Sequence, residues 1–174
     1  MTRSFKLGLL ATFTGAALMS AAAPAQVIRN HNSNAPVDFS AGSLELQDRA
    51  DRVVLSGGVT VTQAGLTLKS SRVTAAYTSQ GKTDVNRLDA TGGVTITKDD
   101  LRATSNAAIY DLDANLITLL GNVDLRQGAN RLNGGRLVID LDSGRSTING
   151  GGASGINNSG GRVTGTFTVP QRDK

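Results

Sequence analysis

The sequence predicts an all-β fold of repeated antiparallel strands, and three observations indicate it. Apolar and polar residues alternate along several stretches, such as Leu55–Tyr77, which is typical of strands with one buried face. The breaks between these stretches are too short for a helical crossover, so neighbouring strands are expected to run antiparallel. The pattern recurs three times with a spacing of roughly 30–35 residues, which favours a repetitive β architecture.

The copies of the repeat are Leu55–Tyr77, Leu88–Leu112 and Leu119–Leu141. In the first copy, Gly57-Gly58 lies inside a run whose alternation does not change phase. We therefore expect a kink or bulge within one continuous strand rather than a turn. Each copy is expected to hold a long bent strand followed by a shorter return strand, with a strand beginning at the equivalent positions Ser71, Asn106 and Gly135.

Residues 1–25 are expected to be a cleaved signal peptide. A basic start at Arg3 and Lys6 precedes the mostly apolar run Leu7–Met19, and Ala23-Pro24-Ala25 supplies the small residues of a cleavage site. The run is shorter than the ~20 strongly apolar residues that a membrane span needs. An uncleaved membrane anchor is the alternative interpretation.

Charge and composition narrow the class of protein. Without Arg3 and Lys6 the net charge falls from +4 to +2, and the remaining basic residues are not interleaved with aromatic residues, so no nucleic-acid partner is expected. A chain without cysteine fits a bacterial periplasm better than a disulfide-stapled secreted module. Five arginines are either scattered surface charges or contacts for anionic sugars and phosphates: Arg102, Arg126, Arg131, Arg136 and Arg145.

The segments outside the repeats are assigned from composition and alternation. They are a flexible N-terminal arm (26–36), short strands (Val37–Ser40 and Ala41–Leu46), a charged turn (Gln47–Asp51), exposed loops (Thr78–Asp84 and the Gly/Asn/Ser-rich 149–161), a last strand (Arg162–Val169) and a charged tail (170–174). One β domain is therefore expected over residues 37–169.

No catalytic site, cofactor or metal is expected. The single histidine, His31, lies in the predicted arm and is expected to be solvated, so neither a Ser-His-Asp triad nor a histidine-based metal site can form within one chain. The acid pairs Asp99-Asp100 and Asp111/Asp113 stand at positions where turns favour Asx residues. The run Gly150–Gly155 lacks the Lys-Ser/Thr ending of a phosphate-binding loop.

The alternating aliphatic rows have two interpretations. They either form a sealed core, or they line a slot between two curved sheet faces that stays open along one side or at its ends. An aliphatic slot suits fatty-acyl chains: at ~0.8 kcal/mol per buried CH₂, a chain of about a dozen carbons contributes roughly 10 kcal/mol before ordering costs. Composition and period alone do not decide between the two.

Several stretches resemble the LptA/OstA-like family of lipopolysaccharide transport. The resemblance lies in Val37–Thr62, in the recurrent Gly-x-Val motif, and in Ser105–Tyr110 followed by Leu116–Leu125. It covers about Val37–Leu141. The same domain occurs in the membrane-anchored LptC and at the start of the outer-membrane protein LptD, and a short chain with a cleavable signal favours the LptA-like kind.

The resemblance implies a twisted open β-jellyroll in the periplasm with no enzymatic activity. It implies an aliphatic groove for the acyl chains of lipid A, and subunits joined end to end with one another and with LptC-like and LptD-like domains. Carried over position by position, the groove would be lined by Val59, Val61, Leu66, Leu68, Val73, Val94, Ile96, Leu101, Tyr110, Val123, Leu125, Leu137 and Ile139. Alternatives are a secreted structural or adhesive β-solenoid with a sealed core and an LptC-like anchored component of the same pathway.

Overall fold

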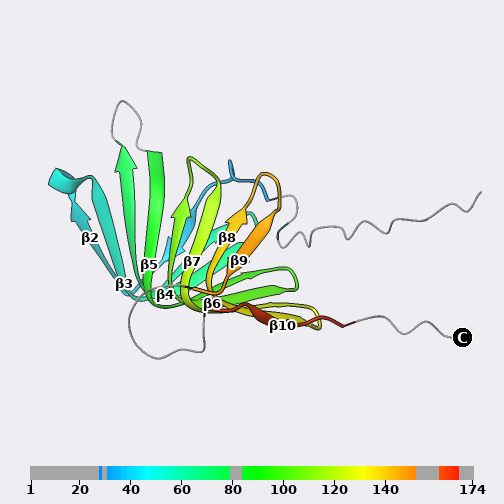
Figure 1. Cartoon of the computed structure of the whole chain (residues 1–174). Helices are drawn as coiled ribbons and strands as arrows, with labels where there is room; N and C mark the ends of the chain where they lie inside the picture. Colours follow the sequence, from blue (N-terminus) through cyan, green and yellow to red (C-terminus); the bar gives the residue numbers. More distant parts are fainter. Residues whose placement is uncertain (1–27, 29–30, 79–83, 152–160, 169–174) are drawn as a thin grey trace, which may run out of the picture.

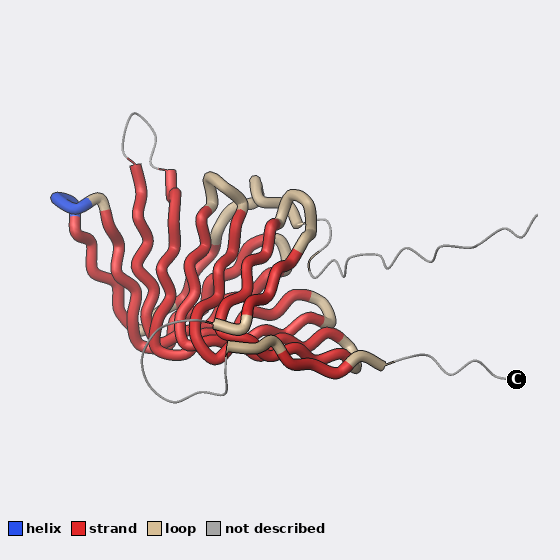
Figure 2. Tube along the Cα trace, in the orientation of Figure 1, coloured by secondary structure: helices blue, strands red, loops and turns tan. Residues whose placement is uncertain are grey.

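The computed structural model describes residues 28, 31–78, 84–151 and 161–168, which form one antiparallel sheet of ten strands. Strands neighbour one another in the order β1-β3-β4-β5-β6-β7-β8-β10, with β2 also paired to β3 and β9 to β8. Figure 2 shows that strand makes up nearly all of the described chain. The elements are β1 (Asp38–Ser40), β2 (Ser43–Gln47), a 3-10 turn (Asp48–Ala50), β3 (Arg52–Gln63), β4 (Leu66–Thr78), β5 (Asp84–Lys98), β6 (Leu101–Asp111), β7 (Leu116–Gln127), β8 (Asn130–Asp140), β9 (Ser146–Asn149) and β10 (Thr164–Thr166).

The strands β3–β8 all bend near their middle, so the sheet folds into two arms that meet at a sharp angle (Figure 1). One arm, here the short-turn arm, holds β1, β10 and the halves of β3–β8 that are joined by two-residue turns. The other, the long-loop arm, holds β2, β9 and the remaining halves. Both arms turn their inner faces toward a shared hydrophobic core.

Residues with positive φ make the bend in β3, β5 and β7. In β3, Gly57 and Gly58 have φ of 81° and 80°, and the register with β4 shifts between Ser56 and Val59. The predicted bulge within a continuous strand is therefore confirmed. Asn122 takes the place of the second glycine in β7 with φ of 49°, because a short amide side chain tolerates the left-handed region better than most residues.

The return strands β4, β6 and β8 bend without positive φ at the bend itself. Ser70 Oγ donates to the carbonyl of Arg72 at 3.0 Å, and Ser105 Oγ donates to that of Ala107 at 2.8 Å, so each serine hydroxyl binds backbone beyond the bend. The prediction that strands begin at Ser71, Asn106 and Gly135 is wrong, because these residues lie inside β4, β6 and β8. Nor is the first return strand short: β4 has 13 residues and β3 has 12.

Tight turns close the hairpins of the short-turn arm. Ala64 and Gly65 between β3 and β4 have φ of 46° and 81°, the two positive values that a type I′ turn requires. Asp99 and Gly128 open the equivalent turns with φ of 52° and 55°. These turns match the right-handed twist of the strands that they join, which favours this register over its neighbours.

The predicted peripheral segments have mixed outcomes. The two short N-terminal strands are present as β1 and β2, and the charged turn holds a 3-10 turn at Asp48–Ala50. The last strand is shorter than predicted, at Thr164–Thr166, and the strand β9 lies where none was expected. Residues 1–27, most of the two predicted loops (79–83 and 152–160) and residues 169–174 lie outside the described residues.

Replacing Gly92 tests the packing of the bend. A Cβ atom at Gly92 would lie 2.7 Å from Ser71 Cβ, whereas one at Gly93 would meet open space, and both residues have φ above 80°. Gly93→Ala should lose about 1–3 kcal/mol of unfolding free energy through backbone strain alone. Gly92→Ala should lose about 1 kcal/mol more through the clash, as measured by urea unfolding.

The clash can be separated from the strain by a double-mutant cycle with Ser71→Gly, which removes the side chain that the new methyl group of Gly92→Ala would meet. Ser71→Gly by itself also removes the hydrogen bond from Ser71 Oγ to the Gly92 carbonyl. The unfolding free energy of the Ser71→Gly variant is therefore the reference for that of the double variant. Equal losses for the alanine variants at 92 and 93, with no coupling to position 71, would contradict this account of the bend.

Candidate functional site

The inner faces of the arms carry apolar rows that cross the sheet from edge to edge. In the short-turn arm, residues paired across successive strands form one row: Phe39, Val61, Leu68, Ile96, Ala103, Leu125 and Leu132. In the long-loop arm there are two rows: Leu44, Leu55, Val73, Ala90, Ala108, Leu119, Leu137 and Ile148; and Leu46, Val53, Ala75, Leu88, Tyr110, Ile117 and Ile139. The rows run perpendicular to the strands and so span the length of the molecule.

All residues predicted to line a groove lie together between the arms. Each of them belongs to the hydrophobic core cluster, and none is more than 4% exposed. Their side chains are therefore shielded from solvent in this structure. The alternation in the sequence identified the inward-facing residues, because neighbouring residues of a strand point to opposite faces.

The apolar rows are uncovered at one edge of the sheet. Phe39, Leu44 and Leu46, at the β1/β2 end of the rows, are 56%, 52% and 56% exposed. At the opposite edge, Val163 and Phe167 flank β10 and are 40% and 61% exposed. Both ends of the sheet thus present apolar side chains beside the backbone groups of edge strands.

A hydrogen bond between polar side chains joins the two arms. Tyr110, near the end of β6 in the long-loop arm, donates from its hydroxyl to Gln63 Oε1 at 2.6 Å. Gln63 is the last residue of β3 in the short-turn arm and is 3% exposed. Burial raises the pKa of Tyr110 to about 12, so its hydroxyl keeps the proton that it donates.

His31 binds to this pair, so the prediction of a solvated histidine is wrong. Its Nε2 lies 3.2 Å from Gln63 Oε1 and 3.5 Å from the Tyr110 hydroxyl. Gln63 Nε2 in turn donates to the carbonyls of Ser33 and Ala35, both at 2.9 Å. Residues 31–35, which fall in the predicted flexible arm, are thereby held against the ends of both sheet arms.

The charge of His31 depends on its surroundings. Burial lowers the pKa of His31 below its ordinary value of 6.5; the hydrogen bond with Gln63 opposes this shift, and the positive charge of Lys98 adds to it. Lys98 is the last residue of β5, is 9% exposed, and donates from Nζ to the carbonyl of Ala64 at 2.9 Å. Burial and the positive charge of Lys98 therefore favour the neutral form of His31.

Sequence analysis missed three of these residues as parts of the interior: Ile28, Gln63 and Lys98. Gln63 and Lys98 continue the inward phase of Val59 and Ile96, so the alternation alone indicates that both side chains point inward. Ile28 is 1% exposed and belongs to the core cluster. Nothing in the polar stretch around Ile28 indicates that it would be buried.

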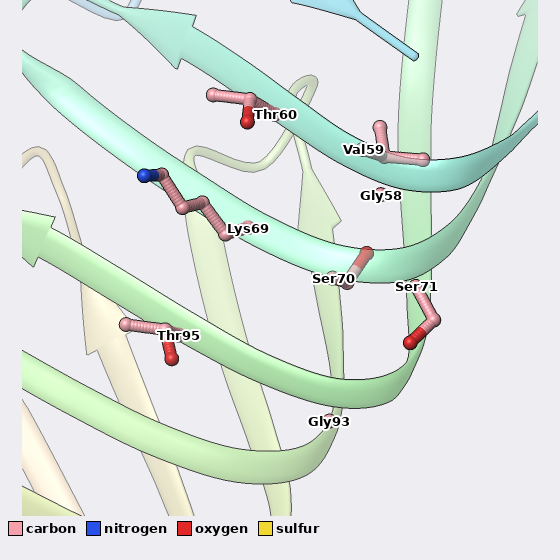
Figure 3. A pocket seen from close by; sticks show the side chains of 8 residues that line it. All are labelled: Gly58, Val59, Thr60, Lys69, Ser70, Ser71, Gly93 and Thr95. Carbon is pink, nitrogen blue, oxygen red and sulfur yellow. The ribbon is translucent and has the colours of Figure 1, made fainter. Parts of the chain in front are cut away.

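A hollow with a volume of about 330 Å³ lies on the sheet near the bend. Figure 3 shows Thr60, Lys69 and Thr95 at its wall; these alternate with the buried residues and so point away from the core. The hollow is lined largely by hydroxyl and glycine residues, and does not coincide with the aliphatic interior.

Three of the other candidate side chains make local polar contacts. Asp111 Oδ1 accepts from the backbone N–H of Ala114 at 2.9 Å, as expected for an Asx residue in a turn. Arg126 and Arg131 both pair with Asp124 on the outer face. Within the described ranges, no group of three or more His, Cys, Asp or Glu residues could hold a metal, and no helix is long and apolar enough to cross a membrane.

The bent sheet and its aliphatic interior define a twisted β-jellyroll, as the sequence predicted. The crystal structure of LptH from Pseudomonas aeruginosa has the same fold, with a TM-score of 0.68 and 19% sequence identity over 78% of this chain and 96% of that one. LptH is described as the LptA-homologous periplasmic component of the lipopolysaccharide transport device.

The family follows from the sequence match. The model of the family described as "LptA/(LptD N-terminal domain) LPS transport protein" matches residues 38–145, more than half of the chain, and the chain belongs to this family. An uncharacterized protein of Rhizobium meliloti (strain 1021) is 26% identical over 147 residues, which are 77% of this chain and 79% of the relative. The family resemblance predicted from the repeats is confirmed, and its description is that of transport proteins rather than enzymes.

Acid should destabilise the contacts of His31. Because the pKa of His31 is lowered in the folded chain, the unfolded chain takes up a proton near pH 6.5 that the folded chain resists, so stability is highest above this pH and falls below it. The free energy of unfolding should decrease more in the wild type than in His31→Gln between about pH 7.5 and about pH 5.5. The His31→Gln variant retains an amide that can donate to Gln63 but has no titrating proton, so equal decreases would show that His31 does not contribute.

Proposed function

We propose that this protein binds lipopolysaccharide in the periplasm and carries it between the inner and outer membranes, with the acyl chains of lipid A lying along the aliphatic interior. The observation that carries this proposal is that inner apolar rows cross the whole sheet and reach exposed apolar residues at the β1/β2 edge. Membership of the lipopolysaccharide transport family supports the ligand class.

The side chains between the arms suit a hydrocarbon ligand. The rows hold Val, Leu, Ile and Ala, and Tyr110 is the one aromatic residue of the core cluster among the described residues. Aliphatic contacts are weak and non-directional, so the arms can separate and exchange them for contacts with an acyl chain. Since the inner side chains are shielded from solvent in this structure, lipid uptake requires such a separation.

End-to-end assembly would make the interior continuous between subunits. At one end, β1 and β2 leave one side of their backbone unpaired beside Phe39, Leu44 and Leu46; at the other end stand β9 and β10. Pairing of one subunit's β1/β2 edge with the β9/β10 edge of the next would satisfy these groups, cover the exposed apolar residues and align the rows. Such a contact is heterologous and therefore open-ended, and LptC-like and LptD-like domains would take the terminal places.

A sealed structural domain is the second candidate, and the low exposure of the inner residues favours it. It differs from the carrier in one measurable respect, because a sealed core retains no lipid. Native mass spectrometry of the periplasmic form separates them: bound lipopolysaccharide supports the carrier, and lipid-free protein under the same mild conditions supports the sealed domain. An LptC-like anchored component would instead retain residues 1–25, which the same mass measurement detects.

Photo-crosslinking should place the lipid between the arms. A photoreactive amino acid at Ile96, which is 0% exposed, should capture lipopolysaccharide in living cells, and so should one at Leu68 or Leu125. The neighbouring Thr95 is the matched control, because it lies on the same strand and points to the outer face. Capture at Thr95 without capture at Ile96 would rule out an interior lipid path.

Two charged variants, each alone and both mixed, should test the end-to-end assembly. Phe39→Asp should block the β1/β2 end and Phe167→Asp the β10 end, because each buries an unpaired carboxylate in the new interface. Each variant alone should lose the oligomer ladder of the wild type in sedimentation velocity. An equimolar mixture should form a dimer through the two intact ends, and unchanged ladders for the single variants would contradict the proposed contact.

A further inference from the structure

The core contains one side chain that does not belong to the sheet. Ile28 is 1% exposed and lies in the cluster formed by the inner residues of both arms. Every other described member of that cluster belongs to β3–β8 or directly follows β8. The inner faces of the two arms therefore leave room for an additional aliphatic group, and the chain fills that room with a residue from its N-terminal segment.

Polar contacts at the rim fasten residues 31–35. The Gln63 side chain binds His31, the carbonyl of Ser33 and the carbonyl of Ala35, with distances between 2.9 and 3.2 Å. Gln63 simultaneously accepts from Tyr110 and so joins the segment to both arms. The four contacts centre on one amide, so a movement of the arms that displaces Gln63 from Tyr110 also disturbs the hold on the segment.

The docking of this segment is incomplete. His31 Nδ1 is buried and has no hydrogen-bond partner among the described residues. A buried polar atom without a partner opposes burial, since it would bind water if the segment were released. The same segment thus gains from burying Ile28 and loses from burying this nitrogen, a balance suited to release.

We infer that the position of Ile28 is the entry subsite for a hydrocarbon chain, and that Ile28, fastened through residues 31–35, is its displaceable occupant. This inference rests on the proposed function. An acyl chain of about ten or more carbons buries more apolar surface than the four-carbon side chain of isoleucine, so it can take over this position once the arms part. Release of the segment also returns His31 Nδ1 to water, which favours the exchange.

Ile28 also explains how the interior stays covered in the protein without lipid. Without Ile28, the space between the arms would expose apolar surface to water in the absence of lipid. With it, the interior remains covered, and the ligand has to compete with the chain's own segment. Weakening the segment should therefore raise the apparent affinity for lipid, in contrast to substitutions in the lining, which lower it.

Thiol labelling tests the exchange in a chain that has no cysteine of its own. In the full-length exported protein, the thiol of Ile28→Cys should react with a maleimide about tenfold more slowly than the thiol of Leu44→Cys, because reaction requires local release of the segment. Purified lipopolysaccharide should bring the rate at position 28 close to that of the control. Deacylated lipopolysaccharide, which has the same sugars and phosphates, should leave it slow.

A second variant measures competition directly. Ile28→Ser should bind lipopolysaccharide several-fold more tightly than the wild type, since the docked segment competes less well without its apolar side chain. The photo-crosslinker at Ile96 reports lipid uptake in every sample. If lipid is captured there while the thiol of Ile28→Cys stays protected and Ile28→Ser binds no more tightly, the inference is wrong and the carrier function stands.

Rapid labelling of Ile28→Cys before lipid is added would also overturn the inference, because the segment would not be docked. If neither the wild type nor Ile28→Ser captures lipid at Ile96, the proposed function fails and the inference fails with it. Circular dichroism of each variant checks that the sheet is folded, which the position of Ile28 outside the strands leads us to expect.

Discussion

The bend shared by β3–β8 is the constraint on which the rest of the structure depends. Each strand must turn from one arm to the other at the same level as its neighbours, or the ladder of hydrogen bonds would be lost on one side. The chain meets this requirement by alternating two devices: residues with positive φ in β3, β5 and β7, and small residues in β4, β6 and β8. Gly92 against Ser71 and Gly121 against Asn106 show the two devices packed together.

Once the bend exists, an aliphatic interior follows from it. Inward-facing residues of both arms approach one another, and their rows extend across the paired strands because the register within each arm places apolar residues opposite one another. Such an interior has few directional contacts to hold it closed. The same residues that form the core in this structure also suit a hydrocarbon chain, so the burial seen here and the proposed lipid uptake depend on one set of residues.

Polar residues give this otherwise uniform interior a defined place where it can open. Gln63, Tyr110 and Lys98 stand at strand ends, where the inward phase of alternation meets the rim of the arms. Hydrogen bonds there have fixed partners and geometry, unlike the contacts of the rows. Residues 31–35 bind to Gln63 at that rim, so a part of the chain outside the sheet is joined to the interior.

The sequence by itself determined the strands, the bulge at Gly57-Gly58 and the inward direction of residues such as Leu68 and Ile96, because alternation and glycine pairs are local properties. It did not reveal that β4 continues through Ser71, since a polar residue at a bend resembles one at a strand start. Only the tertiary structure decided that His31 meets Gln63 and Tyr110, residues 32 and 79 positions away. That contact, like the burial of Ile28, depends on the angle and twist between the arms, which no local pattern encodes.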